Sequence, residues 1–316
     1  MNIFGLVGAL LPVFFVLALG YIAGKRNTFD TDQAAGLSKL ALGFALPAAL
    51  FVSMTDIKRD LLLQQGSLVL ALLIAHVGLF LVALFLLNRI PSLRGTAAII
   101  CALMLSSSAT PVFGIAVLQP LLGDTSTGTV GLVALAINFV MPLAIIFLEM
   151  DSAKPGTASA GTSRRAQVLG GLKSGLQSPL LWAPVIGILV VLVGLHIPKE
   201  VASSFSMIGS ATSGVAVFAV GLTLAAHSFH LSKAVLLGAL GRVTLQTVVL
   251  LALFHMLHVG GPFAREALVC CSFPMATTVV LFAAKYKAME AESASILLLS
   301  TVSLLVTVPA TIAIGK

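Results

Sequence analysis

Two short stretches of this chain combine a proline with neighbouring hydroxyl side chains in the middle of apolar segments. One stretch surrounds Pro111 within Ala97–Leu122, and the other surrounds Pro274 within Ala267–Lys287. Proline removes a backbone N–H and clashes with the carbonyl four residues earlier, so each helix must break or kink there. In lipid, a broken helix is tolerated only where protein or a water-filled cavity satisfies the freed backbone groups. Both stretches therefore predict a cavity in the middle of a membrane.

The helices that restart after these prolines would direct free backbone N–H groups and the positive ends of their dipoles toward one point. Such a point suits an anion, above all a carboxylate. We predict a substrate site made of the backbone and side chains of both breaks: Ser108, Ala109, Thr110, Pro111, Ser272, Pro274, Met275, Thr277 and Thr278. The alternative is that the prolines only kink packed helices, with the hydroxyls bonded to carbonyls of the preceding turn.

Four further polar residues lie inside apolar segments and form an auxiliary set. Arg242 and His76 occupy matching places and predict a basic lining for an anion path, with His76 able to change charge near neutral pH. Alternatively, Arg242 snorkels to the interface and His76 packs as a neutral imidazole. Asn138 and Gln246 are lone amides of the kind that joins membrane helices. We find no catalytic, cofactor-binding or metal-binding motif, because HExxH, a phosphate loop and paired cysteine spacing are all missing from the sequence.

Composition identifies an all-α integral membrane protein. The 316 residues are 59% hydrophobic and only 9% charged, far below the roughly 25% charge of soluble domains. About twenty apolar residues cross a bilayer, and ten segments meet this length: 3–24, 34–54, 67–87, 96–122, 128–148, 176–196, 207–226, 234–255, 263–284 and 293–314. The fourth and ninth are the broken helices. The net charge of +7 gathers in loops and needs no nucleic-acid partner.

The two halves of the chain predict an inverted repeat. Pro12, Pro111 and Pro142 have counterparts in the same order at Pro184, Pro274 and Pro309. Residues 1–149 and 176–316 would each hold five spans of opposite orientation, joined by a Gly/Ala/Ser-rich cytoplasmic linker at 150–175. Loops after odd-numbered spans carry eleven Lys and Arg against five elsewhere, which places those loops in the cytoplasm and both termini outside.

The C-terminal third of the chain resembles the auxin efflux carrier family. The matching features are Pro274, the A-x-x-Y ending at Ala283–Tyr286, Glu290 and Glu292, Ser300-Thr301 and Pro309; LLPVFFVLALGYIAGKR at 10–26 and TPVFGIAVL at 110–118 add to them. The resemblance implies a scaffold of helices 1, 2, 6 and 7, often dimeric, and a mobile transport domain of helices 3–5 and 8–10. It also implies a bacterial inner membrane and, as in the family's bacterial permeases, malonate. Plant members carry Asn where this chain has Ala109, which argues against an indole substrate.

We therefore predict a secondary transporter, not an enzyme, that moves malonate or a similar short carboxylate by elevator-like alternating access. One alternative is a sodium-coupled importer of the bile-acid-symporter type, although Glu149, Asp151, Glu290 and Glu292 all fall at span ends. Another is a membrane receptor that binds a small anion without moving it. The sequence leaves open whether a proton or sodium is the coupling ion, and whether transport is import or export.

Overall fold

The computed structural model describes residues 3–56, 59–123, 126–152, 179–227 and 229–314 as an assembly of helices. Within these ranges there is no β-strand, and the one β-type pairing is an isolated bridge between two helix breaks. Six helical segments are long and apolar enough to cross a membrane: Asp32–Thr55, Gly66–Leu87, Ser126–Leu148, Lys199–Ala226, Lys233–Leu257 and Glu290–Ile314. This is a multi-pass membrane protein.

The helices of residues 3–152 follow the predicted spans closely. Two of these spans contain a π-helical turn, a feature often found at functional sites. The elements are α1 (Ile3–Lys25), α2 (Thr31–Leu40), η1 (Ala41–Ala45), α3 (Leu46–Thr55), α4 (Arg59–Leu63), α5 (Gly66–Leu73), η2 (Ile74–Gly78), α6 (Leu79–Leu87), η3 (Pro91–Leu93), α7 (Thr96–Ser106), α8 (Thr110–Leu122) and α9 (Ser126–Ser152).

The helices of residues 179–314 also follow the predicted spans. They are α11 (Pro179–Val193), α12 (Lys199–Gly209), α13 (Ala211–Ala226), α14 (Lys233–Met256), α15 (Pro262–Cys271), α16 (Thr277–Lys285) and α17 (Glu290–Ile314). The helix that was expected to end before the linker continues to Ser152, and the rest of that linker lies outside the described residues. Ten spans and an inverted repeat stay predictions, because four of the expected spans are not among the six long helices.

Both predicted helix breaks are present. The chain leaves the helix between Ser106 and Thr110 and again between Cys271 and Thr277. Pro111 sits in the first turn of α8, where proline costs no hydrogen bond and has the backbone angle that a helix needs. Pro274 lies inside the second break, outside any helix. Around each proline, therefore, one helix stops and the next one begins a few residues later.

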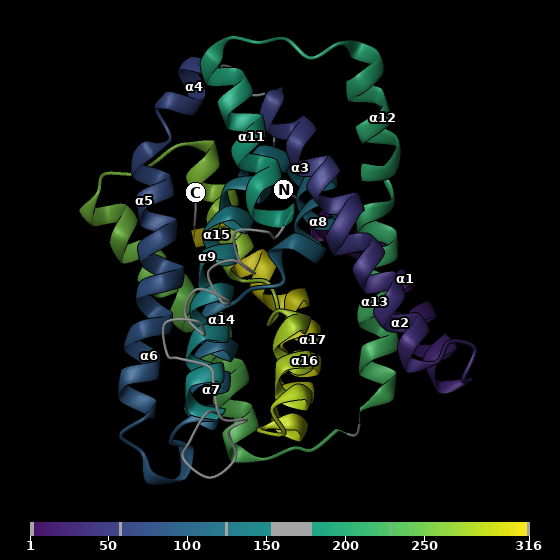
Figure 1. The fold of residues 1–316 in the computed structure, drawn as a ribbon, viewed down its shortest axis with the longest axis vertical. Helices are drawn as coiled ribbons and strands as arrows, with labels where there is room; N and C mark the ends of the chain where they lie inside the picture. The colour runs from purple at the N-terminus through teal and green to yellow at the C-terminus, as the bar shows by residue number, and fades with distance from the viewer. Residues whose placement is uncertain (1–2, 57–58, 124–125, 153–178, 228, 315–316) are drawn as a thin grey trace, which may run out of the picture.

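Helix contacts divide the described chain into two groups. In the first, α1 and α2 pack on α13, and α3 packs on α11 and α12. In the second, α7 packs on α6, α9 and α14, while α17 packs on α14 and α16. Figure 1 shows α5 and α6 along one side and α12 and α13 along the opposite side. Contacts of α8 with α1 and α13, and of α9 with α3 and α11, join the groups.

The N-terminus of α7 is fixed by a carboxylate from the end of α9. Asp151 Oδ2 accepts hydrogen bonds from the backbone N–H and the Oγ1 hydroxyl of Thr96, both at 2.7 Å. The preceding Gly95 has φ +69°, and an added Cβ would lie 2.5 Å from the same carboxylate oxygen. Asp151 therefore supplies the negative charge that a helix N-terminus favours, and Gly95 leaves room for it.

Candidate functional site

The two helix breaks bind each other directly. The N–H of Ala109 donates to the carbonyl of Pro274 at 2.7 Å, and the N–H of Ala276 donates to the carbonyl of Ser107 at 2.9 Å. These bonds flank the antiparallel bridge between Ser108 and Met275. Backbone N–H and carbonyl groups that each break leaves without helical partners are therefore hydrogen-bonded by the other break. Inside a membrane, every backbone polar group needs such a partner. Two segments that are far apart in the sequence thus form one junction.

Helices α8 and α16 both begin at this junction, and neither has a side-chain cap. Their N-cap residues are Ala109 and Ala276, whose methyl groups accept no hydrogen bond. Pro111 has no N–H, and the N–H groups of Val112 and Val279 already donate to the carbonyls of Ala109 and Ala276. The first-turn donors left for a ligand are therefore the N–H groups of Thr110, Thr277 and Thr278, and each helix N-terminus also carries about half a positive charge from its dipole. The junction therefore presents two positive helix ends without a protein acceptor side chain on either.

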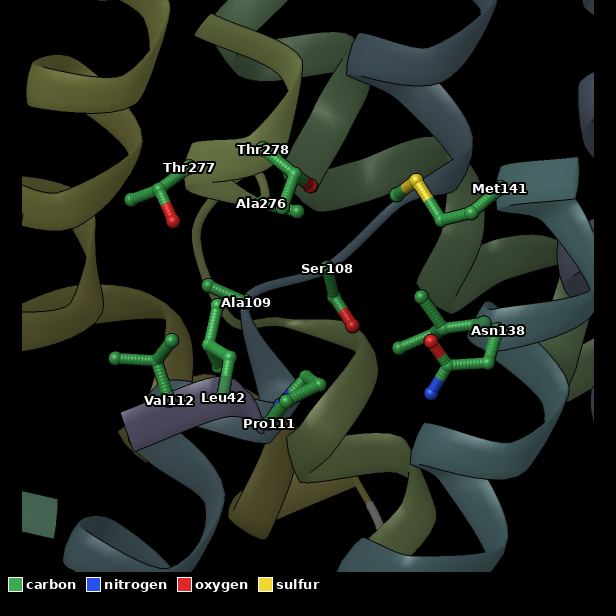
Figure 2. A pocket seen from close by; sticks show the side chains of 11 residues that line it. Leu42, Ser108, Ala109, Pro111, Val112, Asn138, Met141, Ala276, Thr277 and Thr278 are labelled. Carbon is green, nitrogen blue, oxygen red and sulfur yellow. The ribbon is translucent and has the colours of Figure 1, made fainter. Parts of the chain in front are cut away.

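A cavity of about 50 Å³ lies beside the junction. Its lining comes from η1, the first break, α8, α9 and the start of α16: Leu42, Ser108, Ala109, Pro111, Val112, Ile137, Asn138, Met141, Ala276, Thr277 and Thr278. Figure 2 shows the Ser108 hydroxyl and the Asn138 amide on facing sides of the cavity, with Thr277 and Thr278 above them. The lining is thus apolar with a few convergent polar groups, the usual character of a small-molecule site.

Five of the nine predicted site residues line this cavity, and four do not. The five are Ser108, Ala109, Pro111, Thr277 and Thr278. Thr278 Oγ1 is buried and has no hydrogen-bond partner within the part of the chain that the structure describes. Asn138, predicted only as an auxiliary residue, also belongs to the lining, where its Nδ2 donates to the Ala134 carbonyl at 2.7 Å.

The four residues outside the lining contribute to the junction instead. Met275 N–H donates to Ser300 Oγ at 3.3 Å, and Ser272 Oγ donates to the Val269 carbonyl at 2.7 Å. Pro274 supplies the carbonyl that Ala109 binds. Thr110 Oγ1 lies 3.1 Å from the Cys270 carbonyl and 2.6 Å from Ser108 Oγ.

The hydrogen bonds of the Thr110 hydroxyl determine whether the Ser108 hydroxyl can donate to a ligand. A hydroxyl has one proton to donate. Because Thr110 donates its proton to the Cys270 carbonyl, Ser108 must donate its own proton to Thr110. In this arrangement Ser108 presents lone pairs to the cavity, so hydroxyl donors for an anion come from Thr277 and Thr278.

Arg242 does not line the cavity, and it does not snorkel to the interface either. It is 0% exposed and donates to three carbonyls: Leu105 at 3.3 Å, Cys271 at 3.4 Å and Phe273 at 3.2 Å. Its Nη1 also donates to Gln246 Oε1, and Gln246 Nε2 donates to the Ser106 carbonyl at 3.2 Å. Arg242 and Gln246 thus connect the ends of α7 and α15 from behind the junction.

His76 is also absent from the cavity lining. It is fully buried in η2, with Nδ1 at 2.9 Å from the Leu72 carbonyl and no partner for Nε2. The alternative of a packed imidazole describes this position better than a place on an anion path.

Comparisons with known proteins identify the family of the chain. Residues 6–312 match the model of a family described as membrane transport protein. The chain belongs to this membrane transport protein family. The resemblance to auxin efflux carriers is confirmed, and the chain is a transport protein rather than an enzyme.

Curated relatives match almost the whole length of the chain. It is 33% identical over 313 residues to the uncharacterized transporter YfdV of Escherichia coli (strain K12), with 98% of each chain covered, and the YfdV of Shigella flexneri gives the same values. The lysosomal cholesterol signaling protein of mouse is 27% identical over 310 residues, which cover 92% of this chain and 35% of the mouse protein.

Sequence reasoning missed one buried acid of this transport protein. Glu266 is 6% exposed in α15 and accepts a hydrogen bond from the Thr129 hydroxyl of α9. The case against sodium coupling considered only Glu149, Asp151, Glu290 and Glu292, at span ends, and overlooked Glu266. The signal for this residue was its charge inside the predicted span 263–284. In the part of the chain that the structure describes, no three His, Cys, Asp or Glu side chains gather as a metal site would need.

Proposed function

We propose that this family member is a secondary transporter of a small organic anion, with malonate or a similarly short carboxylate as the substrate. The observation that carries the proposal is the convergence of two uncapped helix N-termini, those of α8 and α16, on one cavity. A carboxylate would accept hydrogen bonds from first-turn N–H groups of both helices and from the hydroxyls of Thr277 and Thr278. Asn138 would orient the remainder of the molecule.

The size of the cavity favours the smallest carboxylates. Its volume of about 50 Å³ is well below that of the engineered cavity of about 150 Å³ that binds benzene. The helices must therefore separate to admit any organic solute, and an indole would require a much larger separation than a short carboxylate. Ala109 lines the cavity where plant family members carry Asn, and its methyl group offers no hydrogen-bond donor to a larger ligand.

The position of the cavity supports elevator-like alternating access. Leu42 of η1 belongs to the first helix group, whereas Ser108, Asn138 and Thr277 belong to the second. A smaller pocket of about 10 Å³ between α2, η1, α8, α13 and α16 shares Leu42, Val112 and Thr277 with it. A solute held at the junction would move with the second group, the predicted transport domain, against the first, the predicted scaffold. The proposal also includes ten spans in two inverted halves, a homodimer formed through the scaffold, both termini on the outer side of the membrane and a location in the bacterial inner membrane.

Uptake of labelled malonate into proteoliposomes tests the proposal. Thr278→Val keeps the shape of the side chain and removes its unpartnered hydroxyl, so the KM for malonate should rise about tenfold or more. Thr244→Val is the matched control, because Thr244 is exposed and donates to the Leu240 carbonyl of its own helix at 2.8 Å. Absence of malonate uptake by the wild-type protein would refute the substrate, and equal KM values in the two variants would refute the site.

A second candidate is ion-coupled import, and one observation favours it. Glu266 is the only buried acid among the side chains that the structure describes, and Thr129 of a neighbouring helix holds its carboxyl. Ionisable residues inside membrane proteins are costly and usually mark ion or proton paths. Malonate uptake driven by a sodium gradient or by a proton gradient, and abolished in Glu266→Gln, would support coupling at this residue. Uptake that depends on neither gradient would exclude coupling.

The receptor alternative is tested in the same proteoliposomes. The name of the mouse relative includes signalling, and this chain spans about a third of that protein. Binding of malonate without any flux would decide for a receptor.

A further inference from the structure

The junction contains four helix ends rather than two. The C-termini of α7 and α15 arrive where α8 and α16 begin. A helix C-terminus carries about half a negative charge and an N-terminus about half a positive charge. The four ends together would nearly cancel, so the bare backbone of the junction would not select an anion over a neutral solute.

Arg242 changes this balance. Its guanidinium binds Leu105 O at the end of α7, and Cys271 O and Phe273 O at the end of α15. Leu105 and Cys271 lie in the last turns of α7 and α15, whose carbonyls have no intrahelical donor, and Phe273 lies in the break just beyond α15. The positive charge therefore lies on the negative ends of both helices and leaves the positive ends of α8 and α16 uncompensated.

Among the residues that the structure describes, Arg242 has no acidic partner. Its hydrogen-bond acceptors are three carbonyls and the amide oxygen of Gln246, all of them neutral, and its Nε has none. The guanidinium stays protonated at physiological pH. It is completely buried in a helix that is long and apolar enough to cross a membrane, and little solvent screens the field of a buried charge. A buried and unneutralised cation attracts an anion to the adjacent cavity.

We propose that Arg242 is the residue that determines the charge of the transported solute, although it does not touch the cavity. It acts through the ends of α7 and α15 and through its own field, as a positioning and selectivity residue. The inference rests on the proposed function, because it assumes that the solute binds at the junction.

Four variants separate the charge of Arg242 from its role as a connector. Arg242→Gln keeps hydrogen-bond donors and removes the charge, whereas Arg242→Lys keeps the charge and loses most of the hydrogen bonds. Gln246→Glu places a carboxylate where the guanidinium already donates, so it neutralises Arg242 and stabilises the contact. Gln246→Met is its uncharged control.

The experiment compares uptake of malonate with uptake of neutral malonamide in proteoliposomes. We expect Arg242→Gln and Gln246→Glu to lower the ratio of malonate to malonamide uptake about tenfold or more, since each removes one unit of net positive charge beside the site. Arg242→Lys and Gln246→Met should keep a ratio near that of the wild type. Gln246→Glu decides the question alone if the Arg242 variants fail to fold, because it retains the arginine.

Two outcomes would overturn the inference. A wild-type ratio in Gln246→Glu would show that the charge has no effect on selection. An equal loss of the ratio in Gln246→Glu and Gln246→Met would show that connection of the helix ends, not charge, is responsible. Failure of the wild-type protein to transport malonate would instead refute the proposed function, so the two failures are distinguishable.

Discussion

The crossing of α1 and α13 gives a prediction whose size follows from the structure. Gly20 and Gly221 face each other at this crossing, where small residues allow membrane helices to approach closely. A Cβ on Gly221 would lie 2.3 Å from the Leu17 carbonyl oxygen and 2.7 Å from the Tyr21 nitrogen. These are backbone atoms, so no side-chain rotation relieves the contact. We therefore expect Gly221→Ala to force the two helices apart.

The expected loss of stability can be compared with a control on the same helix. An ordinary contact begins at 3.4 Å, so the helices must separate by about 1 Å. Overpacking of this kind costs about 1–3 kcal/mol. Gly214 has nothing within 4 Å of an added Cβ, so Gly214→Ala should be neutral or more stable by up to about 1 kcal/mol, owing to the helix propensity of alanine.

Thermal unfolding in detergent measures the difference, with a thiol-reactive dye that reports exposure of the buried Cys270 and Cys271. A cost of 1–3 kcal/mol corresponds to a decrease of several degrees in Tm, on the scale of about 2–4 °C per kcal/mol for chains of 150–250 residues. Gly214→Ala should melt at or slightly above the wild-type temperature. A Gly221→Ala protein as stable as Gly214→Ala would refute the close packing of α1 on α13.

Three further predictions concern the junction and its supports. Asp151→Asn should cost about 1 kcal/mol in thermal unfolding, because the N-terminus of α7 loses its charged acceptor; a Tm equal to that of the wild type would contradict this. Thr129→Val should destabilise by about 1–3 kcal/mol by leaving the Glu266 carboxyl unpartnered, whereas Thr129→Ser should not. Pro274→Ala should still insert into membranes but lose malonate uptake, because the restored N–H lets α15 continue through the break; unchanged uptake would contradict the role of the break.

Arg242 and Glu266 show what the sequence leaves open about a buried polar residue. Both residues lie in apolar spans, where charged side chains generally avoid the lipid. The sequence cannot say which neighbour a side chain reaches, because that depends on how helices are rotated against each other. Adjacent residues of a helix point about 100° apart, so Arg265 is exposed while Glu266 is buried.

Local chemistry determined the helices and both breaks. Apolar segments of membrane length predict helices, and proline cannot donate the backbone hydrogen bond that a continuing helix needs. These constraints act within a few residues of Pro111 and Pro274, so the sequence alone predicts where the helices end. Family resemblance was likewise readable, because it depends on the order of residues along the chain.

Tertiary structure alone decided which hydroxyls reach the cavity and where the buried charges lie. Thr110 donates to Cys270, 160 residues away, instead of facing the cavity. Arg242 reaches Leu105 across 137 residues to bind the ends of two helices. Such contacts depend on the packing of whole helices, because each polar group inside a membrane must find a partner among the groups that packing brings near it.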